Sequence, residues 1–279
     1  MSDSRIDALL PAEIAERASA MGVKKATLGI VNMFVLAVLA GGFIALGGLF
    51  ATVVTAGSGG VLPYGVVRLL FGVVFCLGLI LIILAGAELF TGNTLITMAW
   101  ASRKVSTRAL LRNWVIVYSG NLAGALVTAL LVFLSRQYTF GGGAIGQSML
   151  TIANHKVNLD FMQALTLGIL CNALVCIAVW LTLGARTTVD KIFAIIFPIS
   201  AFAAMGFEHS IANMYFIPIG ILIKDFDPAF VARLNLDLGN LTLAGFAGNL
   251  LPVTIGNIIG GVVMVAGVYW FVYLREKSA

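Results

Sequence analysis

A short pattern whose glutamate could interact with a charged substrate occurs twice within apolar sequence. The pattern Gly-x-Glu-x-x-x-x-Asn begins at Gly86 and again at Gly206, so it places Glu88 and Glu208 in matching positions. An ionisable side chain at membrane depth costs about 2.5–3.5 kcal/mol on insertion scales, and it is usually kept only where it lines a cavity, meets a partner or serves a pathway. Two such glutamates predict a membrane transporter or channel that is built from a repeated unit.

The composition is that of a protein with several membrane spans. The 279 residues are 60% hydrophobic and 10% charged, and the mean hydropathy is +1.04, whereas soluble domains carry about 25% charged residues. The net charge of +5 comes from basic residues spread over loops, so it does not indicate a nucleic-acid partner. The three cysteines lie in apolar stretches, where packing is favoured over a disulfide or a metal site. We expect no metal and no cofactor.

The elements that must position the two glutamates are six hydrophobic segments in one channel domain, residues 28–274. Residues 1–27 precede it and predict an amphipathic helix, because Ile6, Leu9, Leu10, Ile14, Ala18 and Met21 recur at helical spacing. Residues 275–279 form a short tail. The six segments are roughly 28–56, 62–101, 113–135, 161–184, 192–223 and 247–274. A span needs about 20 residues, so the second and fifth segments, which carry the glutamates, are each either one broken span or two spans.

Loop charge favours the broken spans. With six spans and both termini in the cytoplasm, twelve of the 17 Lys and Arg residues face inward. If both long segments were pairs of spans, the basic loop at 103–112 would move outside and only eight would face inward. Since positive charge favours the cytoplasmic side, the sequence predicts an all-α protein of six spans in which the second and fifth are broken.

A second repeat divides the chain into two halves. Asn113 is followed seven residues later by Gly120-Asn121, and Asn249 is followed at the same spacing by Gly256-Asn257. These patterns lie in the third and sixth segments, so each half contains three spans. Because three is odd, the halves must be inverted in the membrane, an architecture known in transporters with broken helices near the midplane.

The breaks would expose backbone groups that suit an anion, because half-helix N-termini offer N–H donors and partial positive charge. Two interpretations of the polar residues there remain open. Glu88 and Glu208, with Asn93 and Asn213, either cap the exposed N–H groups or shape a pore. His209 follows Glu208 and is the one histidine within a span; it is either a packed core residue or a pore residue, and imidazole has an unperturbed pKa near 6.5 that suits proton exchange.

The large apolar side chains near the breaks also allow two interpretations. Phe75, Leu79, Leu89, Phe90 and Phe202 are either ordinary core or a constriction that gates by excluding water. Asn172, a polar residue in the apolar fourth segment, either bonds helices together or lines a pore.

Three strings carry a family likeness. They are Ala-Glu-Leu-Phe-Thr (87–91), Gly-Phe-Glu-His-Ser-Ile-Ala-Asn-Met (206–214) and Asn-Leu-Leu-Pro-Val-Thr-Ile-Gly-Asn-Ile-Ile-Gly-Gly (249–261). They resemble the formate/nitrite transporter family, and Leu-Leu-Pro-Ala-Glu (9–13), Asn-His-Lys-Val (154–157) and Lys-Asp-Phe (224–226) look most like its formate channel branch. The chain departs from a typical formate channel at Gly92-Asn93, where Ser-Thr is usual.

The resemblance implies an aquaporin-like fold, a homopentamer and one pore per protomer. The protein would lie among lipids in the bacterial cytoplasmic membrane, and would pass formate, acetate, nitrite or hydrosulfide, with protons as a further partner. It also implies positions for the site residues. Leu89, Phe90 and Thr91 would form a loop on the cytoplasmic side with Leu79 and Phe202 in the same constriction, Phe75 and Val175 would form the outer constriction, His209 would lie between them near Thr91 and Asn257, and Lys156 would lie in the outer vestibule.

Other functions fit less well. Nitrite or hydrosulfide as the main substrate stays open, because the pore chemistry is similar. A water or glycerol channel is disfavoured, because Asn93 and Asn213 are followed by Thr94 and Met214 and not by the Pro-Ala of aquaporin boxes. An intramembrane hydrolase that uses Glu208 and His209 is disfavoured, because no catalytic Ser/His pair, paired Asp or multi-His site accompanies them. We therefore do not expect an enzyme.

Overall fold

The computed structural model describes residues 9–277, and within them every regular element is helical. Ile6 of the expected N-terminal helix and residues 278–279 of the tail lie outside the described residues. The first half comprises α1 (Pro11–Ala26), α2 (Ile30–Thr55), α3 (Tyr64–Phe75), α4 (Leu77–Ala85), α5 (Phe90–Asn93), the 3-10 turn η1 (Thr94–Ile96), α6 (Thr97–Ala101) and α7 (Thr107–Leu134).

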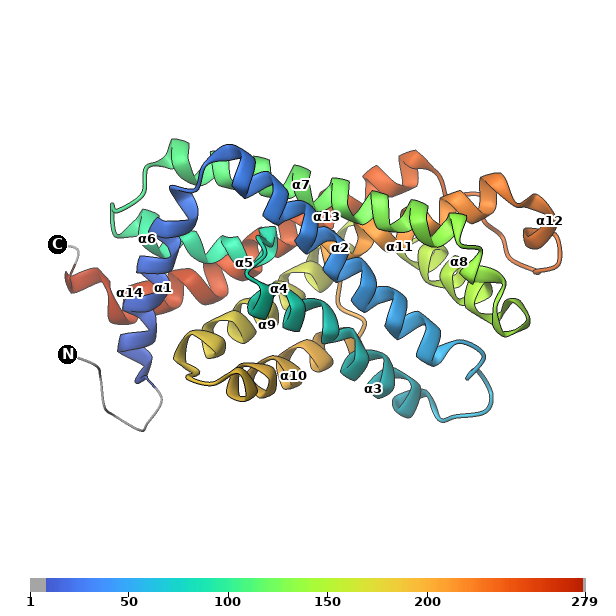
Figure 1. The fold of residues 1–279 in the computed structure, drawn as a ribbon, viewed down its shortest axis with the longest axis horizontal. Helices are drawn as coiled ribbons and strands as arrows, with labels where there is room; N and C mark the ends of the chain where they lie inside the picture. Colours follow the sequence, from blue (N-terminus) through green and yellow to red (C-terminus); the bar gives the residue numbers. More distant parts are fainter. Residues whose placement is uncertain (1–8, 278–279) are drawn as a thin grey trace.

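The second half repeats this order. After two short 3-10 turns (Gln137–Thr139 and Gly141–Gly143) come α8 (Ala144–Val157), α9 (Phe161–Gly184), α10 (Thr188–Ala204), α11 (Ser210–Phe226), α12 (Pro228–Val231), α13 (Leu243–Ile259), the π-helical η4 (Gly260–Gly267) and α14 (Val268–Tyr273), then a last 3-10 turn (Arg275–Lys277). Helices α1 and α14 lie at one end of the elongated molecule, and α8 and α12 lie at the other (Figure 1).

Within residues 9–277, five helical stretches are long and apolar enough to cross a membrane. They are Ile30–Thr55, Tyr64–Ala85, Thr107–Leu134, Phe161–Gly184 and Leu243–Tyr273. The expected segment at 192–223 is divided between α10 and α11, which have 17 residues each. The second expected segment, 62–101, likewise holds α3 and α4 and then, after residues 86–89, α5, η1 and α6.

Helix starts differ from the hydrophobic boundaries because polar caps set them. Helix α7 begins at Thr107, six residues before the expected 113, since the Ser106 hydroxyl accepts a hydrogen bond from the Ala109 N–H at 3.2 Å. Helix α10 begins at Thr188, where Thr187 and Asp190 form a reciprocal capping box. Such a box satisfies two N–H groups that a helix start leaves without partners.

Small residues let two pairs of long helices touch along their backbones. A Cβ added to Gly41 on α2 would lie 2.0 Å from the Asn121 carbonyl oxygen, and one added to Gly124 on α7 would lie 1.9 Å from that of Val38. The second half repeats the contact between α9 and α13, where a Cβ on Gly256 would lie 2.2 Å from the Leu165 carbonyl oxygen. This close packing brings the asparagines beside these glycines against the interrupted segments.

Candidate functional site

Two matching turns interrupt the chain between helices. After α4, Gly86 has φ +80°, and after α10, Gly206 has φ +74°. Glycine adopts this left-handed conformation without the steric cost that a side chain brings. The chain is then extended through Leu89 and His209, which directly precede α5 and α11. Each turn therefore presents a glutamate and then Leu89 or His209 on extended backbone.

One buried asparagine holds the backbone at each turn. The Asn121 side-chain amide donates to the Glu88 carbonyl at 2.9 Å, and its oxygen accepts from the Phe90 N–H at 2.9 Å. Asn257 does the same at the second turn, donating to the Glu208 carbonyl at 2.9 Å and accepting from the Ser210 N–H at 2.9 Å. Each asparagine thus spans one residue, Leu89 or His209. Backbone groups at membrane depth are tolerated only when they are satisfied in this way or face a watery cavity.

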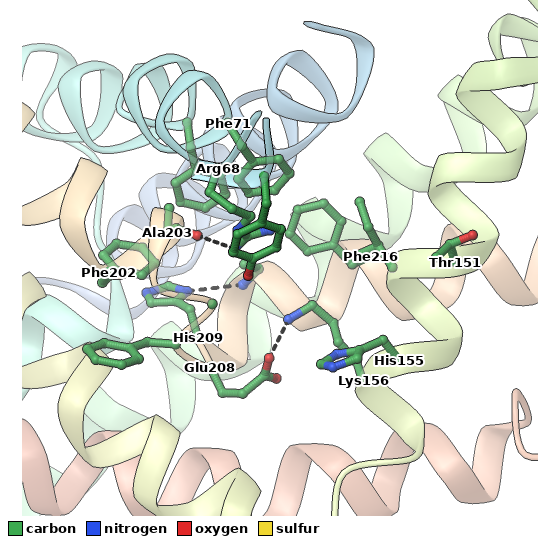
Figure 2. Close-up of a pocket in the computed structure, with 16 residues that line it drawn as sticks. Arg68, Phe71, Thr151, His155, Lys156, Phe202, Ala203, Glu208, His209 and Phe216 are labelled. Carbon is green, nitrogen blue, oxygen red and sulfur yellow. Dashed lines mark hydrogen bonds and ion pairs between the residues drawn. The ribbon is translucent and has the colours of Figure 1, made fainter. Parts of the chain in front are cut away.

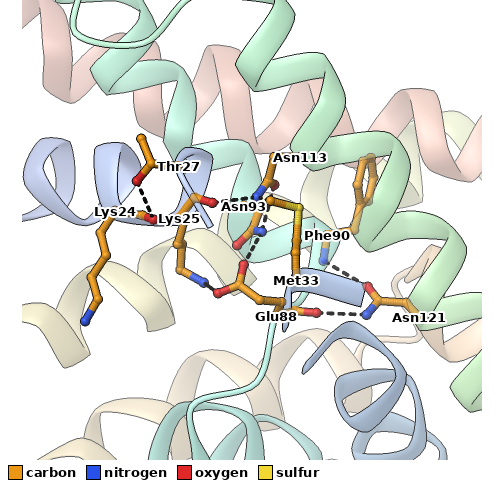
Figure 3. Close-up of polar contacts among 9 residues, drawn as sticks. All are labelled: Lys24, Lys25, Thr27, Met33, Glu88, Phe90, Asn93, Asn113 and Asn121. Atoms are coloured by element: carbon orange, nitrogen blue, oxygen red, sulfur yellow. Dashed lines mark hydrogen bonds and ion pairs between the residues drawn. The ribbon is translucent and has the colours of Figure 1, made fainter. Parts of the chain in front are cut away.

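The two glutamates are each paired with a lysine. Glu88 accepts from the Lys25 ammonium at 2.7 Å, and Glu208 accepts from the Lys156 ammonium at 2.7 Å (Figures 2 and 3). The Glu88 and Glu208 side chains are only 5% and 2% exposed, so the pairing is what makes two buried carboxylates tolerable. Removing one partner of such a pair leaves an uncompensated buried charge and typically costs 3–5 kcal/mol.

Asparagine side chains complete both ion-pair clusters. Asn93 donates to the second Glu88 oxygen at 2.7 Å and to Asn113 at 2.9 Å. Asn213 donates to the second Glu208 oxygen at 2.6 Å and to Asn249 at 2.7 Å. Asn113 in turn donates to the Lys25 carbonyl (Figure 3), and Asn249 donates to the Lys156 carbonyl.

These contacts correct the expectation that the glutamates with Asn93 and Asn213 cap exposed N–H groups. Among the described residues, the hydrogen bonds of both carboxylates come from lysine and asparagine side chains. Asn121 and Asn257 bond the backbone of the turns instead, and the N–H groups of Glu88 and Glu208 donate to the carbonyls of Leu36 and Leu167.

Lys25 is a site residue that the sequence analysis did not identify. It lies in the last turn of α1, and Lys156 lies in the last turn of α8. Both lysines precede the first residue of a long helix, α2 or α9, by five positions. This shared spacing is the feature of the sequence that could have identified Lys25 as the counterpart of Lys156. The structure also places Lys156 on a helix and in an ion pair, not in a solvated loop.

Both ring nitrogens of His209 take part in hydrogen bonds, one as acceptor and one as donor. As the N-cap of α11, it accepts the Ala212 N–H at Nδ1, at 3.1 Å. Nδ1 therefore has no proton of its own, and the neutral ring carries its proton on Nε2. Nε2 lies 3.0 Å from the Thr91 hydroxyl, so it donates to that oxygen. His209 thus links α11 to the first turn of α5 through Thr91.

A cavity of about 410 Å³ opens beside His209 on the side of α8. Its lining includes Phe75, Lys156, Phe202, Glu208 and His209 (Figure 2). The Phe202 ring lies 5.6 Å from the Phe75 ring, edge to face, and 5.9 Å from the imidazole of His209. The prediction places Phe202 in the constriction with Leu79; in the structure α10 packs against α3 and brings the Phe202 ring to that of Phe75.

The other expected site residues lie deeper. Thr91, Asn172 and Asn257 are fully buried. Asn172 donates to the Asn257 carbonyl at 2.6 Å and to the Thr91 carbonyl at 3.3 Å, so its amide nitrogen bonds backbone. Asn257 also uses its amide nitrogen and its oxygen on backbone groups. The four apolar residues of this layer, also buried, are Leu79, Leu89, Phe90 and Val175.

The arrangement suits a small anion better than a reaction. Aromatic rings line the cavity together with His209, whose Nε2–H donates to Thr91, and with the Lys156–Glu208 ion pair. Among the described residues, no three His, Cys, Asp or Glu side chains group closely enough to hold a metal ion.

Comparison with known proteins gives a consistent result. A family model described as formate/nitrite transporter matches residues 12–271. The chain is 45% identical over 282 residues to the formate channel FocA of Escherichia coli (strain K12), with 99% of each chain covered. It is 39% identical to a probable formate transporter of Methanothermobacter thermautotrophicus, over 95% of this chain and 97% of that one.

Solved structures agree. The fold matches a pentameric formate channel with formate bound at a TM-score of 0.82 and 44% identity, over 88% of this chain and 98% of that chain. It matches an FNT family ion channel at a TM-score of 0.78 and 29% identity, over 93% and 98%. The chain belongs to the formate/nitrite transporter family.

Proposed function

We propose that this protein is a channel for formate and related small monovalent anions across a bacterial cytoplasmic membrane. The observation that carries the proposal is the cavity lined by His209, whose Nε2–H donates to the buried Thr91 hydroxyl. Relatives named as formate channels and a solved channel described with formate bound support the substrate. Acetate, nitrite and hydrosulfide share the size and charge of formate, and the same path would take them.

The path has a wet part and a dry part. A carboxylate that leaves the cavity for the buried layer loses its hydration, a heavy cost unless donors replace the water. The His209 Nε2–H is the donor nearest to that step, and Thr91 can rotate its hydroxyl to accept it or to donate in turn. We propose that Leu79, Leu89 and Phe90 form the inner constriction and that Phe75 and Val175 form the outer one, with the Phe202 ring packed against Phe75. Both would exclude water by apolar bulk.

Proton exchange at His209 has a structural condition. Neutral His209 that gives away its Nε2 proton would become an imidazolate unless Nδ1 gains a proton, and Nδ1 already accepts the Ala212 N–H. Exchange with formate therefore requires that Nδ1 be protonated and that this N-cap bond open. We propose that His209 donates a hydrogen bond to the anion near neutral pH and exchanges a proton with it only at low external pH.

We further propose six spans in two inverted halves, with the second and fifth spans interrupted at residues 86–89 and 205–209. The duplicated clusters of Lys25 with Glu88 and of Lys156 with Glu208 support this, because each follows the same order of a short helix, a long helix and an interrupted segment. We propose a homopentamer in which each protomer has its own pore, by analogy with the solved pentameric relative. Residues 28–274 would form the channel domain, which α1 closes on the cytoplasmic side.

Uptake of labelled formate into liposomes tests the proposed function. Vesicles that contain the purified protein should take up formate much faster than protein-free vesicles, and an inward pH gradient should increase the rate. Unlabelled acetate, nitrite and hydrosulfide in the same assay rank the anions by competition. Equal rates with and without protein would contradict the proposal.

Topology is tested by labelling single cysteines in a background that lacks the three native ones. We expect membrane-impermeant reagents to label residues in 56–62 and 137–160 from outside, and residues in 103–110 only after the cells are opened. The α6–α7 connection lies near α1 and α14 in the structure, and α8 lies at the opposite end (Figure 1). Labelling of 103–110 in intact cells would contradict cytoplasmic termini.

A further inference from the structure

Arg68 occupies the mouth of the cavity in an arrangement that neither ion-pair cluster explains. This half-buried residue of α3 lines the cavity together with Lys156, Glu208 and His209. Its guanidinium carbon lies 5.1 Å from the centre of the Phe71 ring. Figure 2 shows the guanidinium reaching across to Ala203, above the turn that carries Glu208 and His209.

The guanidinium holds the end of α10. Its Nε donates to the Ala204 carbonyl at 2.9 Å, and a terminal nitrogen donates to the Ala203 carbonyl. The last carbonyls of a helix have no partners within it and carry about half a unit of negative charge, so a cation there is favourable. Four residues after Ala204 comes Glu208, then His209. Arg68 therefore fixes the point from which the second turn leaves α10.

Arg68 is also a cation without an acidic partner. The ammonium of Lys156 is 2.7 Å from a Glu208 oxygen, so this pair has no net charge and acts at a distance as a dipole. Among the described residues, by contrast, no Asp or Glu oxygen lies within 4.0 Å of a nitrogen of Arg68. Even after the partial charge of the helix end is subtracted, roughly half a unit of positive charge remains at the mouth.

We propose that Arg68, more than Lys156, is the cation that attracts the anion into the outer mouth, and that the same side chain positions the Glu208–His209 turn by clamping α10. This inference rests on the proposed function, since it assigns the entry step of the same path. A net charge in a cleft with low-dielectric walls raises the local concentration of an oppositely charged solute, whereas a neutral pair does so only at short range.

The test measures KM for formate uptake in liposomes at about 0.01 M and about 1 M ionic strength, where the Debye length is about 30 Å and about 3 Å. Arg68→Gln removes the charge and can still donate to one carbonyl. We expect its KM to rise about threefold at low ionic strength, as Coulomb attraction over a few ångströms of water predicts, and to match the unchanged protein at high ionic strength. Arg68→Lys keeps the charge but loses the two hydrogen bonds of the guanidinium to the carbonyls of Ala203 and Ala204. Its KM should therefore stay near that of the original protein, while its melting temperature should fall.

Arg233→Gln is the matched control. Arg233 follows α12 by two residues and lines a separate cavity with Arg136 and Asp227, so its loss should leave the KM unchanged. A low-salt KM for Arg68→Gln equal to that of the original protein, or a rise that persists at high salt, would overturn the attraction. An equal rise in Arg68→Lys would do so too, because that variant retains the charge. Failure of the proposed function would appear separately, as absence of formate flux in the original protein.

Discussion

Replacing His209 by Phe should reduce formate flux by roughly one to two orders of magnitude at every pH. The variant removes the Nε2–H donor from the dry end of the cavity, and a hydrogen bond to a charged group is worth about 1.5–3 kcal/mol. Phe also fills the space beside Phe202 with apolar bulk, which raises the cost of dehydrating the anion. The measurement is the initial rate of labelled formate uptake into liposomes between pH 5 and pH 8.

His209→Asn separates hydrogen bonding from proton exchange. Asparagine is a strong N-cap, so its side-chain oxygen can accept the Ala212 N–H that Nδ1 accepts now, and its amide can donate towards Thr91 as Nε2–H does. It cannot carry a proton in this pH range. We expect anion flux near neutral pH to persist, and the increase at low external pH to disappear.

Comparable melting temperatures of the two variants would show that both fold. If His209→Asn keeps the full pH-dependent increase, the proton role is wrong, and His209 serves to pack and to orient the turn.

Replacing Asn257 by Leu should destabilise the protein by roughly 3 kcal/mol or more. The substitution keeps the branched shape of the side chain, leaves the Ser210 N–H and the Glu208 carbonyl without this partner, and removes a second bond to the Gly168 carbonyl within α9. Each buried polar group left without a hydrogen bond costs about 1–3 kcal/mol, and no water within a bilayer core can replace it. We expect a fall of roughly 6–12 °C in the melting temperature in detergent.

The first turn provides an internal comparison for this effect. Asn121→Leu removes the equivalent bonds to Glu88 and Phe90 and should be about as damaging. Asn158→Ala is the control, because Asn158 is exposed and its hydrogen bonds with Asn154 and Asn240 lie at the surface, where water can replace them, so its loss should change stability by about 0.5 kcal/mol or less. If Asn257→Leu has the same melting temperature as the unchanged protein, the hydrogen bonds of Asn257 do not hold the turn.

Several features of the site could be predicted because they depend on residue type and local spacing. The repeated Gly-x-Glu pattern marks two turns, since only glycine takes positive φ there without strain and a buried glutamate needs a reason to remain. The repeat at Asn113 and Asn249 predicted the division into halves, and the structure uses both residues in the ion-pair clusters. The resemblance also predicted that His209 lies near Thr91, and their side chains are in contact.

Other features depend on how distant helices pack. The offset that Lys25 shares with Lys156 marks it as a repeated position, but nothing local marks Lys25 as the partner of Glu88 or Arg68 as the partner of the Ala203 carbonyl, because these contacts join residues 63 and 135 positions apart. The contact of Phe202 with Phe75 likewise depends on the α3–α10 packing. By itself, the sequence determined the helices, the membrane environment and the two turns, because composition and backbone sterics act locally. Only the tertiary structure decided which charges are paired, because pairing depends on distances between elements that the chain brings together only when it folds.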